Sequence, residues 1–301
     1  MELKYTVQGK YFKIADWIIK WNINELETNE FNYPDKIDAF SATDSFEKIN
    51  LEVQNNLVKE NILKQKIDNS HLLFHDKTSF MPYDIYKKDN NYLWIQNNSA
   101  KHPIIAFEID KDFRQCNLIW DVTNTNGKYA FEYFGRIFPY FALTMDSIVL
   151  HGVLMEYHGK GIIISAPSGT GKTTHARMWR DYKNALIVNG DKSLCVKKNG
   201  RWTGYGMPWC GTSGEYINRS VGIQAVVILE QSESNSIQRL STFDGFKRSI
   251  QNVLFPTWDS SLNIKAIDLL NDIVNSVPVY NLKCRPDLES VEILEREFNR
   301  T

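Results

Sequence analysis

Cysteine is scarce in this 301-residue sequence, and neither sign of charge is in excess. The cysteines form no Cys-x-x-Cys pair, so their spacing indicates neither a zinc site nor a disulfide framework, and we expect buried or unreactive thiols. The 35 basic and 36 acidic residues nearly cancel and are interspersed. A protein that binds an anionic partner such as nucleic acid usually carries an excess of basic residues, and this sequence has none. We therefore expect no nucleic-acid partner. The cysteines are Cys116, Cys195, Cys210 and Cys284.

Long apolar runs are absent as well. No segment approaches the roughly 18 apolar residues of a membrane-spanning helix. The start, MELKYTVQGKYFKIAD, lacks the apolar core of a signal peptide. With 43% hydrophobic and 24% charged residues, the composition is ordinary for a globular protein long enough for two domains. We therefore expect a cytoplasmic protein without a membrane partner.

The first part of the sequence has the short alternating segments that are typical of strands. Polar turns separate several such segments, whereas 45–65 is mixed and could hold a helix. The aromatic-rich segment 127–147, interrupted by Pro139, predicts a largely buried helical connection. We predict a β-rich N-terminal domain over 1–125 and a second domain over 126–301. The predicted strands are 4–15, 17–23, 91–96, 103–110 and 117–124.

The second domain contains a phosphate-binding motif, SAPSGTGKTTHARMW, at 165–179. The spacing from Ala166 to Gly171-Lys172-Thr173 fits a P-loop, with Ala where the strict pattern has Gly. Glycines accept positive φ, so backbone N–H groups can converge on phosphate oxygens at the positive end of the following helix. Lys172 would reach the β- and γ-phosphates, and the Thr173 hydroxyl would complete a Mg²⁺ shell. The predicted nucleotide-binding residues are Ser168, Gly169, Thr170, Gly171, Lys172, Thr173 and Thr174.

Two apolar runs, 148–157 and 162–165, flank the turn-forming sequence His-Gly-Lys-Gly before this motif. Such a hairpin makes the P-loop strand antiparallel to its predecessor, whereas ordinary P-loop proteins reach the neighbouring strand through a helical crossover. A turn centred on Gly159-Lys160 would place His151 opposite Ser168. We therefore predict a mixed α/β sheet with His151 beside the phosphate site.

Asp191 follows the apolar run of ALIVNGDKSLCV at a predicted strand end next to the P-loop strand. A carboxylate there can act as general base toward a hydroxyl or as a metal ligand, although Asn-Gly-Asp also forms turns. We interpret Asp191 as the catalytic base and, with Thr173, as a metal ligand. The segment GYGMPWCGTSGEY predicts either a loop that approaches a ligand or a surface turn around a core Trp209.

These segments resemble HPr kinase/phosphorylase and, through it, the ATP-dependent phosphoenolpyruvate carboxykinases. The run from His151 to Leu154 resembles the kinase family's approach to its nucleotide site, and SGTGKTT is more similar to the carboxykinase P-loop. The segments VGIQAVVILEQ and VPVYNLKCRPDLESVEIL are similar to divergent HPr-kinase-related proteins of bacterial gene clusters. The resemblance covers about residues 148–295 and implies an HPr kinase/carboxykinase-like nucleotide-binding domain with a mixed sheet.

The resemblance implies transfer of the γ-phosphoryl group of ATP, with Mg²⁺, to a serine of a protein or peptide or to a small-molecule hydroxyl. It implies that Arg285 stabilises the transferring group. HPr kinases carry paired aspartates where this chain has Gly190-Asp191. They assemble as hexamers, which leaves a homo-oligomer open.

Two alternatives to the kinase remain. A carboxykinase-like enzyme needs a metal-binding lysine, histidine and aspartate set plus arginines for a dicarboxylate, which the sequence does not place. A non-catalytic nucleotide-binding regulatory protein is favoured by Gly190, because only one carboxylate remains at that strand end.

Overall fold

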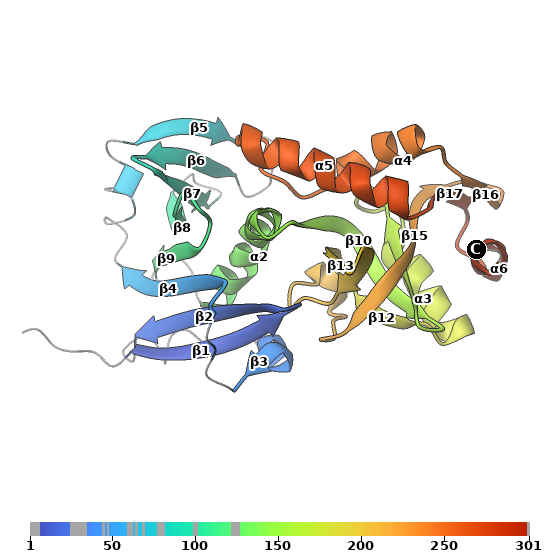
Figure 1. Ribbon diagram of the computed structural model, residues 1–301, viewed down its shortest axis with the longest axis horizontal. Coiled ribbons are helices and arrows are strands. Elements are labelled where there is room, and N and C mark those ends of the chain that lie inside the picture. Colours follow the sequence, from blue (N-terminus) through green and yellow to red (C-terminus); the bar gives the residue numbers. More distant parts are fainter. Residues whose placement is uncertain are drawn as a thin grey trace, which may run out of the picture. The chain divides into compact units, whose positions relative to one another are not determined.

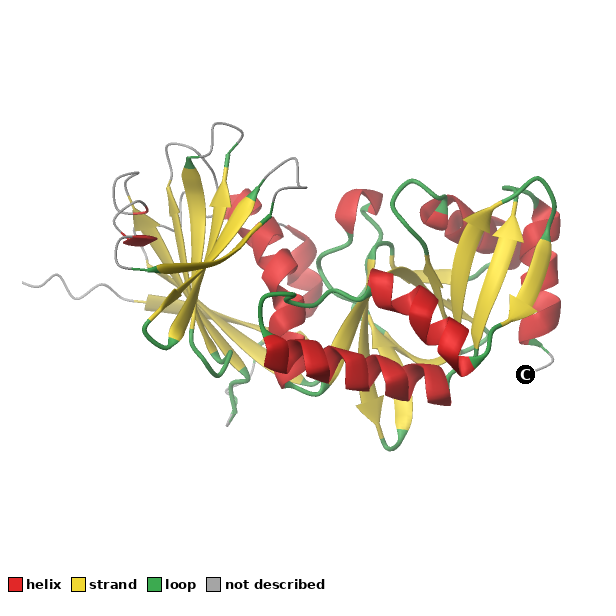
Figure 2. Cartoon of the chain, turned by 90° about the horizontal axis from the view of Figure 1, so that it is seen from above, coloured by secondary structure: helices red, strands yellow, loops and turns green. Residues whose placement is uncertain are grey.

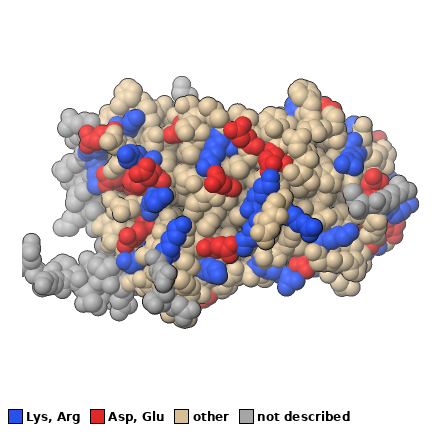
Figure 3. All heavy atoms as spheres, viewed as in Figure 1, with Lys and Arg blue, Asp and Glu red and all other residues tan. Residues whose placement is uncertain are grey.

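The chain folds into two compact units, residues 1–141 and 142–301 (Figure 1). The computed structural model describes residues 7–24, 35–43, 46, 48–58, 63, 66–67, 70–76, 82–98, 102–121 and 127–299. Among these residues, no helix has the length and apolar character needed to cross a membrane. On the face shown in Figure 3, acidic and basic side chains are intermingled.

One mixed sheet forms the first unit, with the strand order β3-β1-β2-β4-β9-β8-β7-β6-β5. β4 runs parallel to β2 and to β9, and the other neighbours are antiparallel. The predicted strands are confirmed where they are described, and the mixed segment 45–65 contributes β4. The elements are β1 (Val7–Ile14), β2 (Trp17–Asn24), η2 (Asp35–Phe40), β3 (Ser41–Ala42), β4 (Leu51–Val58), β5 (His71–His75), β6 (Tyr83–Lys88), β7 (Asn91–Asn97), β8 (Pro103–Ile109) and β9 (Gln115–Asp121).

Helix α2 (Gly127–Thr144) confirms the predicted buried helix and contains Pro139. Its Phe134 ring lies 5.0 Å from that of Trp21 on β2 and 6.1 Å from that of Phe107 on β8. Figure 2 shows the helix running along this sheet. Because α2 buries its aromatic side chains on these strands, the division between the units falls after residue 141, whereas we expected it at 125.

In the second unit, two long strands join two parts of one mixed sheet. The first half of β10 pairs with β13, and its second half lies between β11 and β12. β15 likewise pairs with β14 and then, in parallel, with β11 and β17. The strands are β10 (Ser147–Tyr157), β11 (Lys160–Ser165), β12 (Leu186–Asn189), β13 (Lys192–Lys198), β14 (Arg201–Tyr205), β15 (Ser220–Gln231), β16 (Ser236–Arg239) and β17 (Val279–Cys284).

Helices cover both faces of the sheet in this unit (Figures 1 and 2). Trp179 of α3 and Leu294 of α6 join one apolar cluster with side chains of β10, β11, β15 and β17. On the other face α4 contacts β17, and α5 contacts β10 and β14. The predicted mixed α/β architecture is thus confirmed. The helices are α3 (Lys172–Lys183), η3 (Gly211–Ser213), α4 (Thr242–Ser249), η4 (Ile250–Asn252), α5 (Ser260–Ser276) and α6 (Leu288–Phe298).

The hairpin between β10 and β11 is antiparallel as predicted, but its register is not the predicted one. Tyr157 pairs with Lys160 across a two-residue turn at His158 and Gly159, which have φ values of 49° and 74°. Two consecutive positive φ values suit the twist of a tight hairpin. The predicted turn at Gly159-Lys160 is therefore wrong by one residue, and the pairing ends at Gly152 with Ser165, one residue after His151.

Candidate functional site

The loop between β11 and α3 has the backbone that the sequence motif requires. Gly169 and Gly171 adopt φ values of 79° and 107°. A Cβ atom at either residue would meet nothing within 4 Å, so glycine is favoured there by backbone conformation rather than by space. α3 begins directly after Gly171. The free N–H groups of its first turn therefore adjoin the loop.

Lys172 bends back over this loop. Its Nζ atom donates to the carbonyl oxygens of Ala166 at 2.7 Å and Pro167 at 3.2 Å, and the residue is 8% exposed. Burial lowers the pKa of Lys172, and the negative charge of Asp191 opposes this shift. The structure therefore brings Lys172 and Asp191 within electrostatic range of each other.

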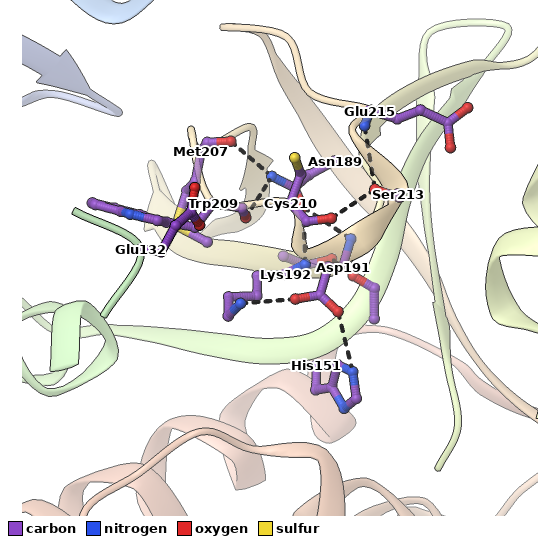
Figure 4. A network of polar contacts seen from close by, with 12 residues as sticks. Glu132, His151, Asn189, Asp191, Lys192, Met207, Trp209, Cys210, Ser213 and Glu215 are labelled. Atoms are coloured by element: carbon purple, nitrogen blue, oxygen red, sulfur yellow. Dashed lines mark hydrogen bonds and ion pairs between the residues drawn. The ribbon is translucent and has the colours of Figure 1, made fainter. Parts of the chain in front are cut away.

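Asp191 lies between two basic side chains (Figure 4). Its Oδ1 atom is 3.3 Å from Nε2 of His151, and its Oδ2 atom accepts a hydrogen bond of 2.8 Å from Nζ of Lys192. Burial raises the pKa of the Asp191 carboxyl, but the hydrogen bond from His151 and the charge of Lys192 outweigh burial and hold that pKa well below its usual range. Asp191 is therefore ionised at physiological pH.

The order of the strands explains why His151 meets Asp191. We expected Asp191 at a strand end next to the P-loop strand β11, and this expectation is wrong because β10 separates β12 from β11. β10 carries His151, which pairs with Lys192, and the backbone N–H of Gly152 donates to the Asp191 carbonyl at 2.9 Å. Lys192 was missed as a site residue, although it directly follows Asp191.

The glycine-rich segment 204–216 packs directly against this strand end. The Asn189 side chain donates to the carbonyl oxygens of Met207 at 2.9 Å and Trp209 at 3.3 Å. Gly211 has a φ of 58°, and a Cβ atom there would lie 2.7 Å from Cγ of Asp191. Trp209 is buried at 2% exposure. The predicted core tryptophan is therefore confirmed. The close approach that the structure shows is to Asp191, and the approach to a ligand stays a prediction.

Ser213 fills the space beside Gly190. A Cβ atom at residue 190 would lie 2.1 Å from Oγ and 2.6 Å from Cβ of Ser213. The Ser213 hydroxyl donates to the Cys210 carbonyl at 2.6 Å and accepts from the Glu215 N–H at 3.2 Å. A second aspartate at 190 is thus incompatible with this loop conformation. No sequence signal identified Ser213.

Two arginines of α3 bind the far end of the same segment. The Glu215 carboxylate accepts hydrogen bonds from Arg177 at 3.2 Å and from Arg180 at 2.8 Å. Both arginine side chains are well exposed, so each pair contributes little to stability by itself. Together they connect the glycine-rich segment to the helix that follows the phosphate loop.

Arg285 lies elsewhere, at a cavity of about 330 Å³ that also borders the phosphate loop. Its guanidinium is held by Asp287, which raises the pKa of Arg285, and by Glu289 at 3.5 Å. His151 and Asp191 do not line this cavity, so the structure groups Arg285 with the loop and not with the carboxylate. The lining residues are Gly169, Thr170, Gly171, Thr174, His175, Met178, Leu229, Gln231, Ser232, Cys284, Arg285 and Pro286.

Within the described part of the chain, no three His, Cys, Asp or Glu residues are arranged as a metal site. Thr173 is partly buried and Asp191 is ionised. A hydroxyl and a carboxylate are oxygen ligands of the kind that Mg²⁺ takes, and Mg²⁺ usually completes its shell with water and phosphate oxygens. All four cysteines are buried and none forms a disulfide, as expected.

Comparisons with known proteins give a family and distant structural likenesses. The HPr(Ser) kinase/phosphatase from Coxiella burnetii is similar with 11% identity and a TM-score of 0.31, over 50% of this chain and 88% of that chain. A likeness this weak carries no argument about the site. No curated protein matches. The family model of the SynChlorMet cassette protein ScmC matches residues 136–287, which is half of the chain. The chain therefore belongs to the family of the SynChlorMet cassette protein ScmC.

Proposed function

We propose that this protein is a phosphotransferase that uses ATP and Mg²⁺ to phosphorylate a hydroxyl group, in the first place a serine of a protein or peptide. The observation that supports this most is the position of Asp191. An ionised carboxylate paired with His151 at 3.3 Å also acts electrostatically on Lys172 of the phosphate loop. Phosphoryl transfer requires mainly such positioned charges, because its transition state is loose.

The phosphates would bind along the loop and the first turn of α3. The backbone N–H groups of 168–174 and the Lys172 ammonium would replace the solvent around the phosphate oxygens. Lys172 would exchange its present carbonyl partners, Ala166 and Pro167, for the β- and γ-phosphates. Mg²⁺, held by Thr173 and Asp191, would supply further positive charge to the transferring group.

The acceptor hydroxyl would approach beside Asp191 and His151. Asp191 would orient the hydroxyl by accepting its hydrogen bond. It would take the hydroxyl proton as the new O–P bond forms and as the bond between the γ-phosphorus and the bridging oxygen breaks, with ADP as the leaving group. The low pKa of Asp191 makes it a weak base. Orientation therefore matters more than base strength in this site.

The nucleoside would occupy the cavity that borders the same loop. A volume of about 330 Å³ lies within the range of small-molecule sites, and apolar side chains such as Leu229 and Met178 line it. Arg285 stands at this cavity, which supports a contact with the nucleotide rather than with the acceptor.

The carboxykinase-like alternative is favoured by one specific observation. It needs a lysine, a histidine and an aspartate around a metal, and Lys192, His151 and Asp191 form one hydrogen-bonded cluster. Nucleotide-dependent release of carbon dioxide from oxaloacetate tests it directly. Activity in that assay, without phosphorylation of any hydroxyl, would replace the kinase proposal.

The variant Asp191→Asn tests the kinase proposal because it preserves shape and removes the negative charge. We expect ATP binding in the presence of Mg²⁺ to persist while phosphoryl transfer falls by a factor of about 10² to 10⁴, the usual effect of losing a positioned base. Binding is measured by calorimetry. Transfer is measured by mass spectrometry and by labelling a cell extract with radioactive ATP.

The matched control is Asp268→Asn, at an exposed position on α5, which should change neither quantity. Transfer at the normal rate in Asp191→Asn would show that Asp191 is not the base. Loss of ATP·Mg²⁺ binding would assign Asp191 to metal coordination alone. ATP binding by the unaltered protein without ADP formation in the presence of extract would favour the non-catalytic regulatory protein.

A further inference from the structure

Glu215 is bound by two different parts of the second unit. Its backbone carbonyl accepts a hydrogen bond of 2.9 Å from the N–H of Gly190, the residue before Asp191. Its carboxylate accepts hydrogen bonds from Arg177 at 3.2 Å and from Arg180 at 2.8 Å, both on α3. In Figure 4 this carboxylate points away from Asp191. Glu215 therefore joins the turn that carries Asp191 to the helix that begins at the phosphate loop.

The backbone that follows Glu215 extends this connection along β12. Tyr216 forms an antiparallel bridge with Asn189, and the N–H of Ile217 donates to the Val188 carbonyl at 3.0 Å. Residues 215–217 are thus paired with the end of β12. A shift of Glu215 would therefore shift this strand end and the turn that follows it.

The backbone that precedes Glu215 lies too close to Asp191 to move independently of it. A Cβ atom at Gly211 would lie 2.7 Å from Cγ of Asp191. Ser213, two residues further along, accepts the Glu215 N–H on its hydroxyl at 3.2 Å, and its carbonyl accepts a hydrogen bond of 3.4 Å from Arg177. The side of the segment that touches Asp191 and the side that touches α3 are therefore parts of one connected structure.

The exposure of these ion pairs separates an effect on catalysis from an effect on stability. The side chains of Arg177 and Arg180 are 44% and 46% exposed, and that of Glu215 is 20% exposed. Exposed ion pairs contribute little to the free energy of unfolding. A displacement of about 1 Å in a reacting group can nevertheless lower a rate about 10²-fold. Loss of the Glu215 charge should therefore affect a reaction at Asp191 far more than it affects the fold.

We propose that Glu215 is a positioning residue that fixes Asp191 relative to the phosphate loop. This inference rests on the proposed function, because the position of Asp191 matters to the reaction only if the acceptor hydroxyl is phosphorylated beside it. The two arginines hold the Glu215 carboxylate from α3, and the Glu215 main chain holds Gly190. Glu215 acts through this backbone contact and not by touching the reacting atoms.

The variant Glu215→Gln tests the inference because it keeps the shape and the backbone contacts but removes the charge that the arginines bind. We expect the rate of transfer from radioactive ATP, with a cell extract as the source of acceptor, to fall about 10- to 100-fold at saturating ATP. The KM for ATP, the affinity for ATP·Mg²⁺ in calorimetry and Tm should stay unchanged. Hydrogen exchange followed by mass spectrometry should become faster in peptides that contain residues 189–191.

Variants of the arginines test the same contact from the helix. Arg177→Gln combined with Arg180→Gln should lower the transfer rate as Glu215→Gln does, and adding Glu215→Gln should cause no further loss. Replacing both arginines by lysine keeps the positive charges and should preserve most of the rate. The matched control is Glu156→Gln on β10, whose carboxylate accepts hydrogen bonds from the exposed Arg219. This control should transfer phosphate at the normal rate.

A normal transfer rate in Glu215→Gln would overturn the inference and leave the proposed function standing. An equal loss of rate in Glu156→Gln would also overturn it, because any exposed ion pair would then have the same effect. A lowered rate with unchanged exchange at residues 189–191 would show that Glu215 does not act through the strand end. Absence of transfer by the unaltered protein would overturn both the inference and the proposed function.

Discussion

Replacing Gly190 by alanine should destabilise the protein through a collision with one identified side chain. The new Cβ atom would lie 2.1 Å from Oγ and 2.6 Å from Cβ of Ser213, well inside van der Waals contact. Overpacking of this kind costs about 1 to 3 kcal/mol. For a unit of roughly 160 residues, that corresponds to a fall in Tm of about 2 to 4 °C per kcal/mol. Urea and thermal unfolding would measure the loss.

The variant Ser213→Gly removes both colliding atoms and therefore provides a specific rescue. By itself it loses two hydrogen bonds, to the Cys210 carbonyl at 2.6 Å and from the Glu215 N–H at 3.2 Å, each worth about 1 kcal/mol. The double variant should nonetheless be less destabilised than the sum of the single ones, with a coupling energy of about 1 to 3 kcal/mol. Gly222→Ala is the matched control, because a Cβ atom there meets nothing within 4 Å. Full stability of Gly190→Ala, or simple additivity in the double variant, would refute the packing of Ser213 on residue 190.

Further predictions concern the phosphate loop and the buried histidine. Lys172→Ala should lower the affinity for ATP at least tenfold, because it removes a positive charge from the phosphate loop. Tm should change little, since the Lys172 Nζ atom donates hydrogen bonds only to carbonyl oxygens of the loop itself. Unchanged affinity in calorimetry would show that the loop does not bind phosphate. Between pH 6.5 and about 4 the unfolded chain binds a proton that folded His175 rejects. The free energy of unfolding should therefore fall as pH falls, by about 3 kcal/mol at 1.36 kcal/mol per pKa unit. His175→Leu should remove this slope in urea titrations at a series of pH values, and an equally steep slope in that variant would contradict a buried neutral imidazole.

Local patterns were sufficient to predict the elements around the site. The glycines of the phosphate loop require positive φ, and the sequence His-Gly-Lys-Gly requires a tight turn, so strand, loop and helix follow from short-range chemistry. The exact turn residues were not predicted, because a two-residue turn could combine Gly159 with the residue on either side of it. The structure places His158 and Gly159 in the turn, both with positive φ. That one-residue change altered the partners of every residue in the hairpin.

Pairings between distant segments could not be predicted in this way. The position of β10 between β11 and β12 depends on long-range strand pairing, and it is this position that places His151 against Asp191. Ser213 beside Gly190 depends on the path of a loop that has no periodic pattern. Lys192 was adjacent to a candidate residue, yet only the pairing of β13 with β10 reveals that it shares the Asp191 carboxylate.

The position of β11 between β10 and β15 has a consequence for synthesis of the chain. A tight turn connects β10 to β11, so these two strands are close in the sequence. The other neighbour of β11 is β15, where Ala225 pairs with Ile162, and β15 comes much later in the chain. Until β15 has left the ribosome, the apolar edge at Ile162–Ile164 has open hydrogen-bonding groups on one side. Such an edge can pair with another chain. The strand that leads into the phosphate loop is thus exposed to misassembly during translation, and β15 ends that exposure.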